Sequence, residues 1–438
     1  MERQKAALHN LGCKVNAYET EAMQQELEQL GYEIVPFSEK ADIYIINTCT
    51  VTNIADRKSR QMLHRAKKQN PNAIVVAAGC YVQKEGELSE TDEAIDILIG
   101  NNRKKDLGRI LEEYQRENIE HKKAILNINQ TKEYEDISID RAQNHTRAYM
   151  KIQDGCNQFC TYCIIPYVRG RVRSRKLEAV REEAEKLAKN GFREIVLTGI
   201  HLSSYGVDID SSLLEAIEVI HEVSGIERIR LGSLEPNIIT EEFVKTIKSL
   251  QKVCPHFHLS LQSGCDTVLQ RMNRRYTAGE YYEKCELLRR YFEDPAITTD
   301  VIVGFPKETE EEFAITQKFL QKVGFFEMHI FKYSKRANTK AAVMPGQIIE
   351  KVKADRSDEL LHLEKEMSCA FRKRRIGKIK KVLIEENIFI EGENYQIGHT
   401  EEYLKVAIKT SKDLVNQIVK VRIEKILEED ILLGERID

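Results

Sequence analysis

Three closely spaced cysteines constrain this chain more than any other feature. Cys156, Cys160 and Cys163 form a C-x3-C-x2-C run within residues 155–163. Soft thiolate ligands select zinc, copper(I) or iron–sulfur clusters. A structural zinc site normally closes with four protein ligands, so three thiolates without an evident fourth favour a four-iron cluster with one open iron. The alternative is a zinc site that His145 or a distant cysteine completes.

Length and charge limit the classes of protein that the chain can belong to. Its 438 residues are enough for two or three domains. The formal net charge is −3, so any contact with nucleic acid must come from local basic patches. The first seven residues lack the apolar stretch of a signal peptide, and no run approaches the roughly 18 apolar residues of a membrane span. We therefore expect a cytoplasmic protein without a membrane partner, whose reduced thiols bind metal or act in catalysis.

The region up to about residue 115 alternates strand and helix signals. Apolar runs at 43–46 and 73–78 have the length of strands. The charged residues 53–68 between them are typical of a helix that begins near Thr52 or Asn53. This alternation predicts a parallel sheet with helices on its faces.

Three further cysteines belong to this first region. Cys13, Cys49 and Cys80 each stand just past the end of a predicted strand. In open parallel sheets the carboxyl ends of the strands share one edge, where ligands bind. We therefore expect these cysteines to converge as a second cluster site. The alternative is that they lie in loops by chance or pack as small buried apolar groups.

The region from 146 to 371 repeats a strand followed by a helix. The expected strands are 148–153, 194–197, 228–231, 257–261, 297–303 and 327–333. Helical stretches such as 177–189 and 308–322 lie between them. Repeated units of this kind predict a partial (β/α) barrel, in which the chemistry takes place on the loops after the strands. The cysteine run occupies the first of those loops.

Two remaining segments differ in composition from these regions. Residues 116–145 are polar and charged, and we expect a linker with one short strand at 124–127. Residues 372–438 contain short alternating runs, which predict a small OB-like β-barrel. Seven of the ten residues at 372–381 are Lys or Arg.

Taken together, the three regions resemble the methylthiotransferase family of radical S-adenosylmethionine (SAM) enzymes over nearly the whole chain. The matching motifs are LGCKVN at 11–16, NTCTVT at 47–52, AGC at 78–80, IIPYVRGR at 164–171, TGIHLSSYG at 198–206, SLEP at 233–236, LQSGC at 261–265 and DVIVGFP at 300–306. The resemblance implies an α/β fold with an N-terminal methylthiotransferase domain at 1–115, a linker at 116–145, a radical SAM domain at 146–371 and an RNA-binding TRAM domain at 372–438.

The resemblance also implies a reaction and a substrate. The segments 47–52 and 198–206 look most like the branch that inserts a methylthio group at C2 of N6-threonylcarbamoyladenosine, next to the anticodon of tRNA. Two alternatives share the chemistry, on isopentenyladenosine in tRNA or on an aspartate of a small-subunit ribosomal protein. A third alternative is a zinc-dependent RNA-binding protein without enzymatic activity.

The cofactors follow from the same resemblance. The C2–H bond of adenine is neither acidic nor easily displaced, so cofactors must carry the hard chemistry. Two 4Fe-4S clusters are implied. The one on Cys156, Cys160 and Cys163 would pass an electron from a donor protein to SAM, and the one on Cys13, Cys49 and Cys80 would hold the transferred sulfur. No catalytic group beyond these ligands is assigned.

Binding groups for SAM and tRNA are expected at strand ends and on basic segments. The SAM candidates are Thr198, Gly199, Ser233, Glu235, Gln262, Ser263 and Gly304, for which ordinary strand-end structure is the alternative. The tRNA candidates are Arg169, Arg171, Arg173, Arg175, Arg372, Lys373, Arg374, Arg375 and Lys378, for which a solvated charged surface is the alternative. Aromatic side chains are expected to stack on an extruded base. No DNA partner is expected.

The segment after the last predicted strand raises two expectations. Lys335 or Arg336 is expected to meet the carboxylate of the threonylcarbamoyl group. Asn338-Thr339 stands where the family often has Gly-Thr, and Asn tolerates the left-handed backbone that such a turn needs. The four remaining cysteines, expected to be ordinary and buried, are Cys254, Cys265, Cys285 and Cys369.

Overall fold

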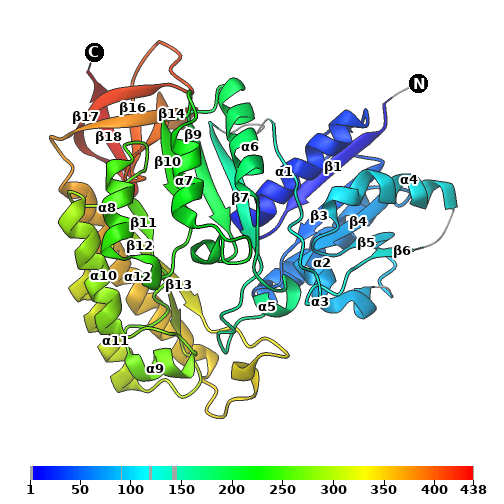
Figure 1. The fold of residues 1–438 in the computed structure, drawn as a ribbon, viewed down its shortest axis with the longest axis horizontal. Coiled ribbons are helices and arrows are strands. Elements are labelled where there is room, and N and C mark those ends of the chain that lie inside the picture. The colour runs from blue at the N-terminus through cyan, green and yellow to red at the C-terminus, as the bar shows by residue number, and fades with distance from the viewer. Residues whose placement is uncertain (1–2, 90, 118–120, 141–145, 438) are drawn as a thin grey trace.

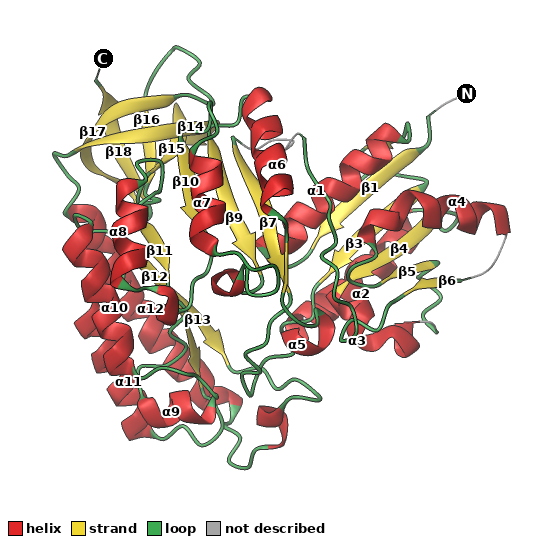
Figure 2. Ribbon diagram, in the orientation of Figure 1, coloured by secondary structure: helices red, strands yellow, loops and turns green. Residues whose placement is uncertain are grey.

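Three β-structures follow one another along the chain (Figures 1 and 2). The computed structural model describes residues 3–89, 91–117, 121–140 and 146–437. An N-terminal parallel sheet comes first, a curled central sheet second and a closed β-barrel last. The fold is therefore α/β, and the three architectures expected from the sequence are confirmed.

The N-terminal sheet has six parallel strands in the order β2-β1-β3-β4-β5-β6. Its strands are β1 (Lys5–Asn10), β2 (Glu33–Ile34), β3 (Ile43–Thr48), β4 (Ile74–Gly79), β5 (Ile97–Ile99) and β6 (Lys122–Ala124). Its helices are α1 (Lys14–Gln29), α2 (Asn53–Gln69), α3 (Cys80–Ser89), η1 (Lys104–Asp106) and α4 (Leu107–Glu117). Every residue of β3 is buried, as expected for a central parallel strand with both faces covered.

The sequence correctly predicted where α2 begins, but it placed the last strand of the sheet a few residues too late. Thr52 is the N-cap of α2 and its hydroxyl accepts a hydrogen bond from the backbone N–H of Ala55 (3.1 Å). The strand expected at 124–127 lies at 122–124, where β6 extends the sheet past residue 115. The segment after it is more than a loose linker, because Ile139 is fully buried and Tyr134 donates to the backbone oxygen of Lys151 (2.7 Å).

The central strands form an open, curled sheet in two hydrogen-bonded parts. These are β10-β9-β7-β8 and β11-β12-β13, parallel except for β8. Parallel bridges at Ile229–Val253 and Leu234–Leu259 connect the two parts. The bounds are β7 (Arg147–Asp154), β8 (Arg173–Ser174), β9 (Glu194–Gly199), β10 (Arg228–Leu231), β11 (His256–His258), β12 (Ala296–Val303) and β13 (Glu327–Lys332). The sequence predicted all of these strands except the two-residue β8.

Helices cover the outer face of the curled sheet (Figure 2). The helical segments of the central region are α5 (Ile165–Val168), α6 (Leu177–Lys189), η2 (Leu202–Ser204), α7 (Leu213–His221), η3 (Pro236–Ile238), α8 (Glu241–Ser249), α9 (Asp266–Arg271), α10 (Ala278–Tyr291), α11 (Glu310–Val323), η4 (Lys340–Val343) and α12 (Glu350–Lys373). Of these, α5 lies beside α3 and not on the outer face. Capping boxes at Ser212, Thr277 and Thr309 fix the starts of α7, α10 and α11. Within the described ranges, every helix is too short or too polar to span a bilayer.

The C-terminal strands close into a barrel in the order β14-β15-β16-β18-β17. Their bounds are β14 (Ile379–Ile390), β15 (Glu393–Thr400), β16 (Lys405–Ile408), β17 (Ile418–Glu428) and β18 (Ile431–Arg436). The sequence did not predict β15, whose polar residues lack clear alternation. Its pairing with β14 depends on the two-residue turn Glu391-Gly392, where both φ angles are positive (47° and 86°) as in tight hairpins.

The barrel binds to the amino-terminal ends of the central strands. Arg228, the first residue of β10, donates to the backbone oxygen of His399 (2.9 Å). Arg230 donates to the backbone oxygen of Glu401 (2.9 Å) and, through Nε, to the buried carboxylate of Glu194 (2.7 Å). The opposite, carboxyl-terminal ends of the strands are therefore left to the cysteine loop.

A buried group of charges joins the N-terminal sheet to the central sheet. Glu19 on α1 accepts hydrogen bonds from Lys104 (2.6 Å), Lys151 (2.7 Å) and Arg169 (2.8 Å). Asp154 at the end of β7 also pairs with Lys151 (2.7 Å) and Arg169 (3.1 Å). Burial opposes ionisation of Glu19, but the charges of Arg169, Lys104 and Lys151 hold its pKa well below the ordinary value of 4.5.

Replacing Glu19 by Gln should destabilise the protein strongly, because three buried cations lose a counter-charge. Breaking a buried ion pair typically costs about 3–5 kcal/mol of unfolding free energy. Urea unfolding of Glu19→Gln, compared with Glu182→Gln at an exposed position of α6, measures this cost. Since the folded-state pKa of Glu19 is depressed, the difference should be full above pH 4.5 and shrink as the pH falls below it. Equal stability of the two variants at pH 7 would contradict this role.

Candidate metal and cofactor site

The loop that follows β7 holds Cys156, Cys160 and Cys163 in a fixed shape. The backbone N–H of Cys156 donates to the oxygen of Gly170 (3.0 Å), and that of Cys163 donates to the oxygen of Cys160 (2.9 Å). Gly155 turns the strand into the loop with φ of +71°, and a Cβ there would lie 1.8 Å from the backbone oxygen of Arg171. Only glycine fits this position.

The three cysteines of this loop line one cavity of about 330 Å³. Arg274 donates to the sulfur of Cys160 (3.2 Å). The backbone nitrogen of Gln158 lies 3.5 Å from the sulfur of Cys156. Burial raises the pKa of Cys156 to about 11 and that of Cys163 to about 12. Metal binding must therefore displace protons, and donors aimed at sulfur favour the ligated thiolate. His145, the considered fourth ligand of a zinc site, lies outside the described residues.

Cys13, Cys49 and Cys80 lie together at one edge of the N-terminal sheet. Cys13 is the N-cap of α1, Cys49 follows β3, and Cys80 is the first residue of α3 after β4. A Cβ built on Gly12 would lie 3.0 Å from the sulfur of Cys49, so the chain beside Cys13 runs against Cys49. The placement is the one expected from the shared edge of a parallel sheet.

Donors also surround this second group of sulfurs. Arg169 donates through Nε to the sulfur of Cys80 (3.3 Å), which lies 3.5 Å from the side-chain amide nitrogen of Asn101. Burial, followed by the charge of Cys80, raises the pKa of Cys49 to about 12. Three thiols with hydrogen-bond donors at one strand edge fit an iron–sulfur cluster, whose sulfur ligands and their hydrogen bonds tune its properties.

The cavity beside the first cysteine group extends to the N-terminal sheet. Val51 and Thr52, which come shortly after Cys49, line it together with Asp300 and Phe331 of the central sheet. Asn53 connects the two sheets at this point, because its backbone N–H donates to the hydroxyl of Ser334 (3.2 Å). One cavity is therefore bordered by the loops that carry cysteines of both groups.

Three of the expected SAM contacts line this cavity: Ser233, Glu235 and Gln262. Glu235 accepts hydrogen bonds from Gln158 (3.2 Å) and pairs with Arg274 (3.0 Å) and His201 (3.1 Å). Burial raises its pKa, but the hydrogen bond from His201 and the charge of Arg274 more than offset this and lower the pKa of Glu235. Glu235 is thus an ionised acceptor beside Cys160.

The other four residues expected to contact SAM pack or form hydrogen bonds within the protein at the ends of strands. Thr198 is buried in β9, and a Cβ on Gly199 would lie 2.9 Å from Gln153. Ser263 is fully buried and bonds to the hydroxyl of Thr316 (3.2 Å). Gly304 donates through its backbone to Glu308 (2.6 Å). None of the four is among the residues that line the cavity, and their contact with SAM stays a prediction.

The expected arginine surface after the cysteine run is mostly internal. Arg169 and Arg173 are fully buried, and Arg175 is 3% exposed. Arg173 donates to the backbone oxygens of Arg169 (2.9 Å) and Arg171 (3.0 Å), and Arg175 donates to Asp136 (2.8 Å). The prediction that these three bind tRNA is wrong, because their side chains are buried in the interior. Arg171 alone of the four is exposed.

The basic segment before the barrel also contains both buried and exposed cations. Arg372 and Arg375 are buried, where Arg372 donates to Glu327 (3.1 Å) and Arg375 to the backbone oxygen of Asp294 (2.7 Å). The prediction of RNA contacts is therefore wrong for these two. Exposed positions are Lys373, Arg374 and Lys378.

The two cations expected to contact the substrate, Lys335 and Arg336, differ in exposure. Arg336 is 1% exposed and donates to Asp56 (2.6 Å) and to the hydroxyl of Thr50 (2.7 Å). Arg336 thus joins the two sheets, and the expectation that it meets the substrate is corrected. Lys335 is exposed, and its backbone oxygen accepts from Asn53 (3.2 Å).

Two smaller expectations can be compared with the structure. Asn338 has φ of 68°, which confirms the left-handed turn. Of the four remaining cysteines, Cys254, Cys265 and Cys285 are buried as expected, whereas Cys369 is half-buried.

The sequence did not point to several groups at the cavity. Arg274 lies between Cys160 and Glu235, outside any recognised motif. The Tyr333 hydroxyl lines the cavity, is buried, and has no hydrogen-bond partner among the described residues. Outside the cavity, Arg171 stacks over the ring of Phe159 (4.5 Å), which also meets the 40% exposed Tyr167 edge-on (5.9 Å). The positive φ of Phe159 (51°) was not foreseeable from the sequence.

Comparisons with known proteins agree with this arrangement. Residues 5–100 match the model of the Uncharacterized protein family UPF0004, and residues 150–320 match that of the radical SAM superfamily. The chain is 41% identical to the threonylcarbamoyladenosine tRNA methylthiotransferase MtaB of Bacillus subtilis, over 96% of this chain and 93% of that protein. Identity to the protein of the same name from Aquifex aeolicus is 41%, over 96% and 100%. The tRNA-2-methylthio-N(6)-dimethylallyladenosine synthase of Thermoanaerobacter pseudethanolicus is 35% identical, over 95% and 89%.

Solved structures share the fold at low sequence identity. The radical S-adenosylmethionine methyltransferase TsrM from Kitasatospora setae matches 78% of this chain and 77% of its own, with a TM-score of 0.55 and 14% identity. The cobalamin-dependent S-adenosylmethionine radical enzyme OxsB matches 84% and 56%, with a TM-score of 0.52 and 13% identity. The curled sheet and its cysteine loop thus define a radical SAM enzyme, a class that uses SAM and a 4Fe-4S cluster. The chain belongs to the radical SAM methylthiotransferase family.

Changing Gly12 to Ala should weaken metal binding by the N-terminal cysteines. The new Cβ would press on the sulfur of Cys49 at 3.0 Å, at a backbone φ of +114° that disfavours a side chain. Gly31→Ala is a matched control, since Gly31 also has a positive φ (+91°) but nothing lies within 4 Å of its Cβ position. We expect iron bound after anaerobic reconstitution to fall in Gly12→Ala and not in Gly31→Ala. Equal iron content in the two variants would show that the close approach of residue 12 to Cys49 does not matter for metal binding.

Proposed function

We propose that this chain is the tRNA methylthiotransferase that replaces the C2 hydrogen of N6-threonylcarbamoyladenosine, next to the anticodon, with a methylthio group. The relatives at 41% identity carry that substrate in their names, while those at 34–35% are named for dimethylallyladenosine. The structural observation that carries the proposal is the cavity that Cys156, Cys160 and Cys163 line and that Val51 and Thr52, shortly after Cys49, also border. A substrate base placed there would lie between the first cysteine group and the loop that follows Cys49.

The residues at the cavity divide among three cofactors. Cys156, Cys160 and Cys163 would hold one 4Fe-4S cluster, and a second 4Fe-4S cluster would sit on the N-terminal cysteines, Cys13, Cys49 and Cys80. Ser233, Glu235 and Gln262 would bind SAM. When bound, these groups supply the radical that removes the C2 hydrogen and the sulfur and methyl group that replace it.

The chain's own side chains orient and shield this chemistry. The ionised Glu235 accepts hydrogen bonds, so hydroxyl groups of a ribose are suitable donors to it. Arg274 places a positive charge between Glu235 and Cys160, which offsets the negative charge that collects around sulfur ligands. The buried Tyr333 hydroxyl, without a partner among the described residues, can bond to a ligand in the cavity.

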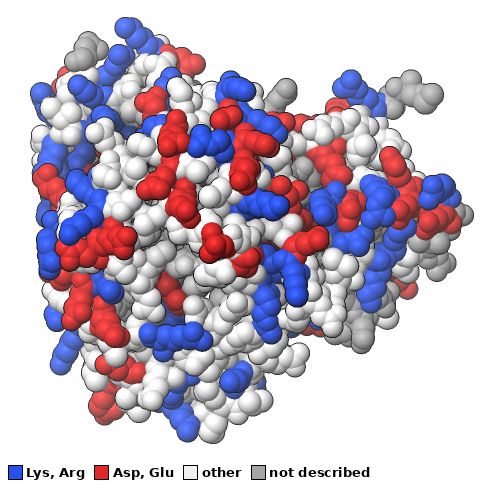
Figure 3. Space-filling model, in the orientation of Figure 1, with Lys and Arg blue, Asp and Glu red and all other residues white. Residues whose placement is uncertain are grey.

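The proposed tRNA surface combines few cations with aromatic rings. Lys and Arg alternate with Asp and Glu over the face drawn in Figure 3, so no single basic field covers it. Arg171, Phe159 and Tyr167 form a partly exposed stack beside the cysteine loop, suited to an unpaired base. Lys335, together with Lys373, Arg374 and Lys378 at the entry to the proposed TRAM barrel, would contact phosphates. A cytoplasmic electron-donor protein completes the set of partners.

Nucleoside mass spectrometry tests the proposed reaction directly. Anaerobically reconstituted protein, given SAM, a reductant and tRNA with threonylcarbamoyladenosine, should form its 2-methylthio derivative. Changing Cys13, Cys49 and Cys80 together to Ala should abolish this product while SAM cleavage at the other cysteine group persists, whereas Cys254→Ala is a control. Preferred modification of dimethylallyladenosine or of ribosomal protein would reject the substrate, and zinc without iron would reject the enzyme.

Removing the aromatic stack should weaken tRNA binding rather than the chemistry. Loss of base stacking on an aromatic ring typically costs about 1–3 kcal/mol. We therefore expect Tyr167→Ala to raise the KM for tRNA about 10-fold or more and to leave SAM cleavage without tRNA unchanged. Tyr282→Ala, on the helix α10 of the outer layer, serves as a control. A KM unchanged by Tyr167→Ala would remove the stack from the tRNA surface.

A further inference from the structure

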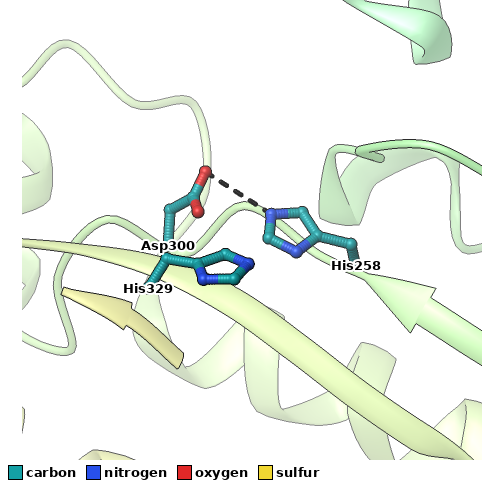
Figure 4. Close-up of side chains that lie close together, drawn as sticks. All are labelled: His258, Asp300 and His329. Atoms are coloured by element: carbon teal, nitrogen blue, oxygen red, sulfur yellow. Dashed lines mark ion pairs between the residues drawn. The ribbon is translucent and has the colours of Figure 1, made fainter. Parts of the chain in front are cut away.

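Three ionisable side chains meet on neighbouring strands of the curled sheet (Figure 4). His258 on β11, Asp300 on β12 and His329 on β13 each offer an atom within 4.8 Å of the others. Nε2 of His258 lies 3.4 Å from Asp300, and its Nδ1 lies 3.0 Å from the hydroxyl of Thr298. The rings of His258 and His329 stack with centroids 5.7 Å apart. Nothing in the chemistry described so far uses this group.

The group lies on the same face of the sheet as the cavity. Side chains two apart on a strand share a face. Ser260, Ile302 and Phe331, which stand two residues beyond His258, Asp300 and His329, all line the cavity. Asp300 lines it as well. The cavity floor therefore continues from the cysteine loop toward the two histidines.

Lys14 adds a cation to this floor from the N-terminal sheet. It is the first residue of α1 and directly follows Cys13. Its charge reaches His329: burial lowers the pKa of His329, Asp300 raises it, and His258 and Lys14 lower it further. The floor thus presents two imidazoles and a carboxylate, and α1 begins with the cation Lys14 directly after Cys13.

We propose that Lys14, His258, Asp300 and His329 form the binding site for the polar amino-acid arm of the substrate base. The arm offers a carboxylate, a hydroxyl group and amide groups. An ammonium suits the carboxylate, imidazole nitrogens suit the hydroxyl, and Asp300 suits an N–H donor. This inference rests on the proposed function and moves the carboxylate contact from Arg336, which is buried in an ion pair, to Lys14.

An apolar arm would be rejected by the same residues. A site built to hydrogen-bond its substrate discriminates strongly against an analogue that lacks the groups, because its own polar atoms are then left unpaired. A dimethylallyl arm has no donor or acceptor for two imidazoles and a carboxylate. Discrimination between the two modified bases is therefore assigned to this floor.

A divalent cation is the competing ligand for two histidines and one carboxylate. Zinc titration therefore forms part of the test. Stoichiometric, tight zinc binding that His329→Phe abolishes without changing the choice of base would overturn the proposal.

The experiment compares His329→Phe and Lys14→Gln with Lys335→Ala and with the control Lys245→Ala on the exposed side of α8, each as full-length, anaerobically reconstituted protein. Rates are measured on tRNA bearing either the threonylcarbamoyl or the dimethylallyl arm. Iron content and SAM cleavage without tRNA confirm that the clusters are intact. We expect His329→Phe and Lys14→Gln each to lower the preference for the threonylcarbamoyl substrate about 10-fold or more, mainly through KM, and Lys245→Ala to keep it.

The outcomes separate this inference from the proposed function. If the unmodified protein does not act on the threonylcarbamoyl substrate, the proposed function fails first. If it does, and both His329→Phe and Lys14→Gln keep the full preference with normal iron content, the binding site is wrong while the function stands. Loss of preference in Lys335→Ala alone would also overturn the assignment, since the discriminating cation would then lie outside the floor.

Discussion

The buried carboxylate of Glu19 is the interaction on which the geometry of the whole site depends. The helix that carries Glu19 also begins at Cys13, and Arg169, which donates to Glu19, also donates to the sulfur of Cys80. Arg169 comes six residues after Cys163, so a single guanidinium links the two cysteine groups. Because a buried charge without its partner is very costly, the N-terminal sheet cannot shift against the cysteine loop without breaking this network.

A second buried pair holds the far side of the cavity. Arg336, after β13, reaches Asp56 and Thr50, which follow Cys49. Both ion-pair systems join the N-terminal sheet to the central region. The barrel, held at the opposite ends of the strands by Arg228 and Arg230, leaves the cavity mouth uncovered. The fold thus places the barrel and the cavity at opposite ends of the central strands.

The sequence predicted what local patterns determine and missed what distant partners determine. Strands such as β3 and β10 and the strand-end positions of the six cysteines follow from apolar runs and from the shared edge of parallel strands. The alternating arginines at 169–175 predicted an exposed basic surface. The prediction failed because the acceptor of Arg169 is Glu19, which lies 150 residues away in the sequence. Arg336 and Asp56 are separated by 280 residues. No local pattern reveals that such charges are internal.

The burial of these arginines changes how recognition of RNA must work. Arg169, Arg173, Arg175, Arg372 and Arg375 lie in the interior, so their guanidinium groups do not supply phosphate contacts. Because the net charge of the chain is −3, any affinity from counterion release depends on local groups of exposed cations. Selectivity must then come from stacking beside the cysteine loop and from the groups that the base meets inside the cavity. The same arginines that rigidify the site therefore shift discrimination from the tRNA backbone to the modified base itself.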